Sequence, residues 1–241
     1  MALALFSITT ISFTSFLILI ILSRKKLFAR NLNLILALAS GALLGEVFLH
    51  IIPEFSSLSS EIFSTIILLS VFSNYFVEII LNVRHCHNLE HHHEAETTKS
   101  SLRFRLIISD IVHNLLDGFT LFASFIISTE LGIATTLAIL LHEIPKEISS
   151  FAMLIEAGFT KTKAIKINLL TAIAGIVGVV VSNYANLSDY SEYLLAFVAG
   201  NFLYIAMTDI LPELHLTESK KSGLLKLLAF SVGVAIMWLM K

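Results

Sequence analysis

The chain has few of the residues that a water-soluble domain needs. Only 14% of its 241 residues are Asp, Glu, Lys or Arg, and it contains three prolines and one cysteine. The single cysteine, Cys86, excludes an intramolecular disulfide and leaves the redox compartment open. So little charge cannot cover a soluble domain of this length with polar surface. The net charge of −2 implies no nucleic-acid partner.

Apolar sequence is abundant instead. Hydrophobic residues make up 56% of the chain, and the mean hydropathy is +0.86. In lipid every backbone N–H and C=O must be paired internally, and long apolar runs without period-two alternation achieve this as helices rather than as a barrel. The sequence therefore predicts one all-α integral membrane domain, residues 1–241, embedded in a lipid bilayer. Its location in the plasma membrane or an intracellular membrane stays open.

Eight runs of about 20 apolar residues, each bounded by charges, predict transmembrane helices. They lie near 2–22, 32–53, 62–82, 103–128, 131–156, 163–183, 192–213 and 223–240. The first run is similar to a secretory signal, but its basic residues Arg24, Lys25 and Lys26 follow the apolar segment rather than precede it. We therefore expect a retained anchor.

The basic residues fall in alternate connections. Most of the 16 Lys and Arg residues follow the first, third, fifth and seventh runs. By the positive-inside rule that side is cytoplasmic, which puts both termini outside. The opposite connections carry no basic residue, and their acidic residues are Glu54, Glu61, Glu130, Asp189 and Glu192.

One long polar connection, residues 83–102, is rich in histidine and lies on the predicted cytoplasmic side. Its candidate ligands are His85, Cys86, His87, Glu90, His91, His92, His93, Glu94 and Glu96. Imidazole and thiolate groups at this density favour loose binding of zinc or copper, whereas the scarcity of apolar residues argues against a folded site. The alternative is a solvated linker.

The fourth run contains polar residues near the bilayer centre, where ionisable groups are costly and mark function. Asp110, His113 and Asp117 recur at intervals of three and four, so they share one helical face, with Asn114 beside them.

The fifth run carries a matching cluster. His142 lies one turn from Lys146, and Glu143 lies one turn from Glu147. Pro145 interrupts the helical hydrogen bonds at this level. Both clusters fall near the middle of their runs, so imidazoles and carboxylates from two helices can meet as a four-ligand site for zinc. The alternative for any one of these groups is an interhelical hydrogen bond.

Two motifs carry a family resemblance. HNLLDG in the fourth run and HEIPKE in the fifth resemble the paired metal-site motifs of the ZIP (Zrt/Irt-like) metal transporters. GEVFLHIIPE and AGNFLYIAMTDILPELH are similar to helices of the ZIP subfamily whose cytoplasmic loop after the third span is His-rich. The resemblance implies a 3+2+3 arrangement of eight helices and a central metal site lined by His113, Asn114, Asp117, His142 and Glu143.

Lys146 departs from the family pattern, in which a Glu or His capable of binding metal is usual. A protonated ammonium has no lone pair to donate, and the sixth run offers only Asn168 near its start. We therefore expect one transported ion, with Lys146 as a built-in cation beside Glu147 where a second ion would otherwise bind. The alternative is that Lys146 extends to the cytoplasmic interface.

Two further polar sets surround prolines at helix ends. The first set consists of Glu46, His50 and Glu54 around Pro53. The second set consists of Asp209, Glu213 and His215 around Pro212. The predicted orientation puts the two sets at opposite faces, as an inverted repeat would. We expect entrance ligands in the first set and exit ligands in the second, the alternative being polar residues at a helix-end interface.

The sequence thus predicts a carrier that moves Zn²⁺, with Fe²⁺ or Mn²⁺ as further substrates, toward the cytoplasm without a catalytic cofactor. A zinc-dependent intramembrane hydrolase, either a protease or a lipid amidase, is the alternative. Two features argue against a protease: HEIPKE has Lys146 in place of the second His of the HExxH signature, and Pro145 interrupts the helix that would carry the signature. A receptor role is disfavoured by the buried charges. The number of subunits stays open, with a homodimer among the alternatives.

Overall fold

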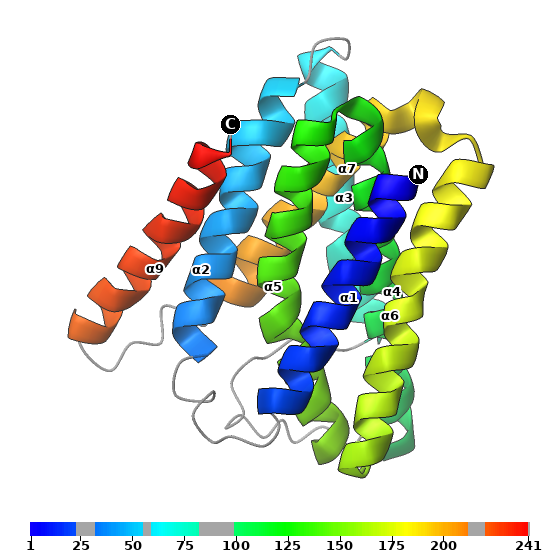
Figure 1. Ribbon diagram of the computed structural model, residues 1–241, viewed down its shortest axis with the longest axis vertical. Coiled ribbons are helices and arrows are strands. Elements are labelled where there is room, and N and C mark those ends of the chain that lie inside the picture. Colours follow the sequence, from blue (N-terminus) through cyan, green and yellow to red (C-terminus); the bar gives the residue numbers. More distant parts are fainter. Residues whose placement is uncertain (23–31, 55–58, 82–98, 212–219, 241) are drawn as a thin grey trace.

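The computed structural model describes residues 1–22, 32–54, 59–81, 99–211 and 220–240, and within these ranges the chain is all-helical (Figure 1). Helices occur at all eight ranges that the sequence predicts. The α-helices are α1 Ala2–Leu22, α2 Leu32–Gly45, α3 Ser60–Leu81, α4 Lys99–Ile127, α5 Thr129–Glu156, α6 Lys161–Tyr184, α7 Ser191–Tyr204 and α9 Lys220–Leu239.

Two of these helices continue as π-helices. After α2 the chain forms η1, Glu46–Ile51, and then the 3-10 turn η2, Ile52–Glu54. After α7 it forms η4, Ile205–Ile210. A further 3-10 turn, η3 Leu187–Tyr190, precedes α7. The apolar runs of the sequence predict none of these changes of helix type. π-helical segments often mark functional sites, and η1 contains Glu46 and His50.

Six of the described helical segments are long and apolar enough to cross a membrane: α1, α2 with η1 and η2, α3, α4, α6 and α9. Helix α5 is not among them, because the charged residues Glu143, Lys146 and Glu147 lie in its middle. The α7–η4 segment is also outside this set. The fold is therefore a multi-helical membrane protein in which one central helix is unusually polar.

The helices form two groups that meet along α2, α5, α4 and α7. Helices α1, α4, α5 and α6 pack on one another, while α2 packs on α9 and α3 packs on α7. Figure 1 shows α5 between α2 and α1. The groups join where α2 contacts α5 and where α4 contacts α7. A buried apolar core between them includes Leu43, Ile139 and Phe202.

Glycines allow two helix pairs to approach until their backbones touch. A Cβ on Gly118 of α4 would lie 2.1 Å from the carbonyl oxygen of Gly175 in α6, and a Cβ on Gly41 of α2 would lie 2.1 Å from that of Phe230 in α9. Small residues permit this close packing between helices in membranes. In both pairs the two backbones lie too close for a side chain to fit between them at these positions.

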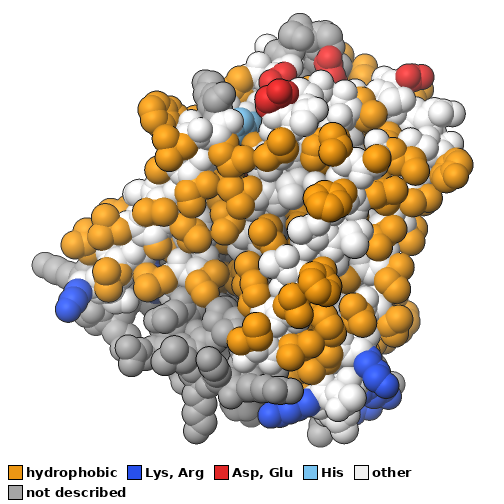
Figure 2. All heavy atoms as spheres, viewed as in Figure 1, with side chains coloured by type: hydrophobic (Ala, Val, Ile, Leu, Met, Phe, Trp, Pro, Cys, Tyr) orange, Lys and Arg blue, Asp and Glu red, His pale blue; other side chains and the backbone are white. Residues whose placement is uncertain are grey.

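The outer surface is divided by residue type. Figure 2 shows hydrophobic side chains over the middle, Lys and Arg side chains at the lower end and Asp and Glu side chains at the upper end. Both ends of the chain that are marked in Figure 1 lie toward the upper, acidic end. A belt of apolar side chains between charged ends is the surface that a bilayer requires.

Candidate metal centre

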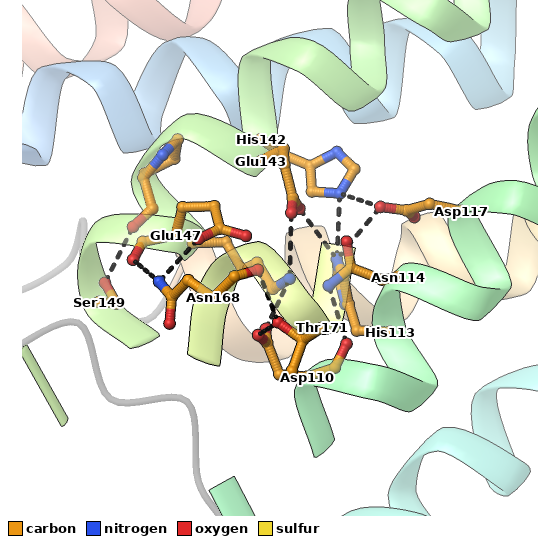
Figure 3. Close-up of polar contacts among 12 residues, drawn as sticks. Asp110, His113, Asn114, Asp117, His142, Glu143, Glu147, Ser149, Asn168 and Thr171 are labelled. Carbon is orange, nitrogen blue, oxygen red and sulfur yellow. Dashed lines mark hydrogen bonds and ion pairs between the residues drawn. The ribbon is translucent and has the colours of Figure 1, made fainter. Parts of the chain in front are cut away.

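Four side chains from α4 and α5 converge between the two helices (Figure 3). They are His113, Asp117, His142 and Glu143, and each offers one ligand atom within 4.8 Å of the others. All but His113 are buried. His113 and Asp117 share a face of α4 because they are four residues apart. The structure thus brings together these four residues of the two predicted clusters.

The distances between the ligand atoms suit a single small cation. His142 Nε2 lies 3.3 Å from His113 Nε2 and 3.7 Å from Asp117 Oδ2. His113 Nε2 lies 3.5 Å from Asp117 Oδ2 and 3.6 Å from Glu143 Oε2. Ligand atoms on a zinc tetrahedron, each about 2.0–2.1 Å from the ion, are about 3.3 Å apart. Four of the six distances among these groups are therefore close to the edge lengths of a tetrahedral zinc site.

Two buried carboxylate oxygens in this group lack hydrogen-bond partners. They are Asp117 Oδ1 and Glu143 Oε2. A buried carboxylate oxygen without a donor is unfavourable unless a cation compensates it. The arrangement has the chemistry of a cation site.

The orientation of the His142 ring is fixed by two neighbours. Its Nδ1 lies 3.1 Å from the Ala138 carbonyl oxygen one turn earlier in α5, and its ring packs edge-on against Phe202 of α7 with centroids 6.0 Å apart. Because a carbonyl can only accept, Nδ1 carries the proton and donates it to Ala138. The lone pair of Nε2 then faces the site, as binding to a metal requires.

The structure places the remaining predicted residues of α4 and α5 beside this group. Asn114 is buried, and its Nδ2 donates to the Asp110 carbonyl oxygen at 2.9 Å. Lys146 Nζ lies 2.7 Å from Asp110 Oδ1 and 3.1 Å from Glu143 Oε1. Lys146 is therefore buried among carboxylates and does not extend to an interface. Glu147 Oε2 accepts from Asn168 Nδ2 of α6 at 2.7 Å.

Glu46 and His50 form a separate buried pair in η1. His50 Nδ1 lies 2.9 Å from Glu46 Oε2, and Thr135 of α5 donates to Glu46 Oε1 at 2.5 Å. Ser124 Oγ of α4 lies 3.0 Å from the Thr135 hydroxyl. The pair therefore lies at a junction of α2–η1, α4 and α5 instead of in the central group.

Several predicted residues lie outside what the structure describes. They are the side chain of Asp209, the residues Glu213 and His215 of the same set, and all nine candidate ligands of the His-rich connection between 85 and 96.

Sequence reasoning missed three residues that contact this polar interior. Thr171 donates to Asp110 Oδ2 at 2.5 Å, Thr135 binds Glu46 as described above, and Phe202 covers His142. Thr171 could have been found, since it lies three residues after Asn168 on one face of an apolar helix. Thr135 gives a similar signal, since it lies seven residues before His142 on one face of α5. Phe202 gives none, because it reaches His142 from a helix distant in sequence.

Comparison with known proteins agrees with this geometry. The profile of the family described as "ZIP Zinc transporter" matches residues 82–241. The chain is 30% identical over 223 residues to "Zinc transporter ZIP13" of Pongo abelii, covering 89% of this chain and 68% of that protein. It is 33% identical over 248 residues to "Zinc transporter YKE4" of Saccharomyces cerevisiae, covering 87% of this chain and 71% of that protein. This chain belongs to the ZIP zinc transporter family.

Membership of the ZIP family makes the chain a multi-pass membrane transporter rather than an enzyme. The hydrolase alternative drawn from HEIPKE is accordingly not favoured. "Zinc transporter zipt-7.2" of Caenorhabditis elegans is 37% identical over 139 residues, covering 55% of this chain and 30% of that protein. The ZIP profile includes every residue of the four-ligand group.

Proposed function

We propose that this chain carries Zn²⁺ toward the cytoplasm, one ion at a time, through a site made by His113, Asp117, His142 and Glu143. The observation that supports it best is the close approach of the four ligand atoms, within 4.8 Å of one another, inside a helical membrane protein. Two imidazoles and two carboxylates suit a borderline cation. Zinc is therefore the preferred substrate in this proposal, and Fe²⁺ or Mn²⁺ are further candidates.

The proposal includes eight membrane-spanning helices in a 3+2+3 arrangement with an inverted repeat. Helices α2 and α7 support the repeat, because each has 14 residues and is followed by a six-residue π-helix. In this alignment Gly41 matches Gly200, and His50 matches Asp209. Figure 1 supports the inversion, since α2 runs upward and α7 runs downward.

Helix packing gives further support. A Cβ on Gly41 would meet a backbone carbonyl of α9, and a Cβ on Gly200 would lie 2.5 Å from the Ile67 carbonyl oxygen of α3. If α1, α2 and α3 form one set of three helices and α6, α7 and α9 the other, the third helix of each set packs on the second helix of the other set. An internal two-fold relation accounts for this exchange, with α1, α2 and α3 equivalent to α6, α7 and α9 around the central pair α4 and α5.

We assign the acidic upper end to the outside and the basic lower end to the cytoplasm. Glu46 and His50 then lie on the entrance side of the central site. Thr135, which binds Glu46, is seven residues before His142 in α5, about 10 Å along the helix. An entering ion would be passed over this distance. Asp209, Glu213 and His215 are the proposed exit ligands, and a homodimer is the proposed assembly.

Uptake of zinc into proteoliposomes tests the central site. We expect His113→Ala, Asp117→Ala and His142→Ala each to lower zinc flux about 100-fold or more, because even neighbours of metal ligands change affinity 10–100-fold. Thr136→Val is the matched control, since Thr136 donates only to Gly132 of its own helix and should leave flux unchanged.

Deletion of residues 85–96 should reduce flux far less, because a polar loop cannot provide a path through hydrocarbon. If the deletion stopped flux while His113→Ala and Asp117→Ala transported normally, the proposed site would be wrong.

A further inference from the structure

A second buried cluster adjoins the proposed zinc ligands, and Asp110, Glu147, Asn168 and Thr171 mark its place in Figure 3. It contains the ammonium of Lys146 instead of an open cation position. Lys146 Nζ lies 2.7 Å from Asp110 Oδ1 of α4 and 3.1 Å from Glu143 Oε1 of its own helix. The lysine is 7% exposed and Asp110 is 4% exposed. Both therefore lie within the protein interior, where an ammonium needs carboxylate partners and a carboxylate needs a cation.

Helix α6 completes this cluster with neutral oxygen and nitrogen groups. Thr171 donates to Asp110 Oδ2 at 2.5 Å, and Asn168 Nδ2 donates to Glu147 Oε2 at 2.7 Å. Both α6 residues are 2% exposed. Asn168 Oδ1 is buried without a hydrogen-bond partner. Side chains from α4, α5 and α6 thus contribute carboxylate, hydroxyl and amide groups to this cluster, and oxygen is the ligand atom that hard divalent cations prefer.

Glu143 links the two clusters through its two carboxylate oxygens. Oε1 contacts Lys146, and Oε2 lies 3.6 Å from His113 Nε2 on the side of the zinc ligands. Oε2 also lacks a hydrogen-bond partner. The ammonium therefore holds Glu143 with one oxygen directed at the zinc position, and it compensates carboxylate charge that would otherwise attract another ion.

We propose that the Lys146 ammonium permanently occupies a second cation position next to the zinc site, so that the chain binds one metal ion where its carboxylates could hold two. Removing the ammonium opens that position to a divalent cation, with Asp110, Glu143 and Glu147 as ligands. Lys146 is thus a positioning residue that sets the number of ions. This inference rests on the proposed zinc site, because Glu143 belongs to both clusters.

Metal content of the purified full-length chain, equilibrated with Zn²⁺ and measured by mass spectrometry, tests the proposal. The His-rich connection adds a constant background, so differences between variants are compared. Asp117→Ala should lose one ion relative to wild type, and Lys146→Glu should gain one. Asp110→Asn should lose none in the wild-type background but should remove the gained ion in the Lys146→Glu background. Lys146→Arg keeps the cation and should gain none.

X-ray absorption at the zinc edge gives an independent readout. Paired metal sites have ions about 3.5–4 Å apart, so a metal–metal distance in this range should appear in Lys146→Glu and be absent from wild type. Its presence in wild type would overturn the proposal. So would a correctly folded Lys146→Glu or Lys146→Gln that gains no ion. Should both variants unfold, the wild-type spectrum alone decides between one ion and two.

The two proposals fail in different ways. If Asp117→Ala loses no ion, the central zinc site is wrong. If Asp117→Ala loses its ion while Lys146→Glu gains none, the zinc site stands and only the role of Lys146 is refuted.

Discussion

At the scale of single residues, the proposed zinc ligands depend on side chains that do not bind metal. His142 is the clearest case, since Ala138 accepts its Nδ1 proton and Phe202 of α7 packs against its ring. The first contact selects the tautomer, and the second limits rotation of the ring. Both act on a ligand that is itself buried, so the site is held in shape before an ion arrives.

Replacing Phe202 by Leu tests this support. The edge-on contact of two rings contributes about 0.5–1.5 kcal/mol beyond its buried area, which corresponds to about a 2- to 12-fold loss of zinc affinity. Isothermal titration of the purified chain measures this loss.

Phe122→Leu is the matched control, because Phe122 is an equally buried phenylalanine in the apolar core. Both variants should lower the unfolding temperature similarly, but only Phe202→Leu should weaken zinc binding. Equal zinc affinity in the two variants would contradict a positioning role for Phe202.

At the scale of elements, the contact between α4 and α6 is the tightest support of the site. A Cβ on Gly178 would lie 2.4 Å from the Leu115 carbonyl oxygen, in addition to the contact of Gly118 with Gly175. Because α4 carries His113 and Asp117, any displacement of α4 from α6 moves two ligands. It also moves Asp110 away from Thr171.

Gly118→Ala should therefore destabilise the protein by about 1–3 kcal/mol, the usual effect of overpacking. The new methyl group would meet the Gly175 carbonyl oxygen, a backbone atom that cannot rotate away as a side chain could. Thermal unfolding in detergent measures the change, and zinc affinity should fall with it. Leu170→Ala on α6 is the control, because Leu170 is 66% exposed and faces away from α4. A Gly118→Ala variant as stable as wild type would mean that the two helices are farther apart than described.

The sequence predicts the elements well and their internal geometry poorly. Charges such as Lys161 and Lys163 bound the apolar runs, so helices occur at all eight predicted ranges. The π-helices after α2 and α7 leave no comparable signal, because they depend on tertiary packing. The grouping of the four proposed ligands is predictable from the intervals within α4 and α5. The Lys146–Asp110 ion pair is not, because it depends on how two helices are rotated against each other.

At the scale of the whole molecule, the uneven charge distribution favours one orientation in the membrane. Acidic residues gather at the upper end and basic residues at the lower end in Figure 2, with apolar side chains between them. The two chain ends marked in Figure 1 lie toward the acidic end. An orientation with that end outside obeys the positive-inside rule.

Epitope tags test this orientation. Tags at the two ends of this sequence should be reached by antibody from outside intact cells, or from the lumen if the protein lies in an intracellular membrane. A tag inserted at residue 94 should be reached only from the cytoplasm. A tag after Glu130, between α4 and α5, is the internal control and should behave like the ends. Ends on opposite sides would mean an odd number of spans.

The fixed position of the Lys146 ammonium also has an electrical consequence. A charge on a side chain returns with the protein at the end of each cycle, so it contributes nothing to net current. A second mobile Zn²⁺ in its place would add two elementary charges per turnover, each worth about 2.3 kcal/mol per 100 mV. The proposed carrier with one ion and a built-in lysine therefore moves two elementary charges per turnover, where a two-ion carrier would move four.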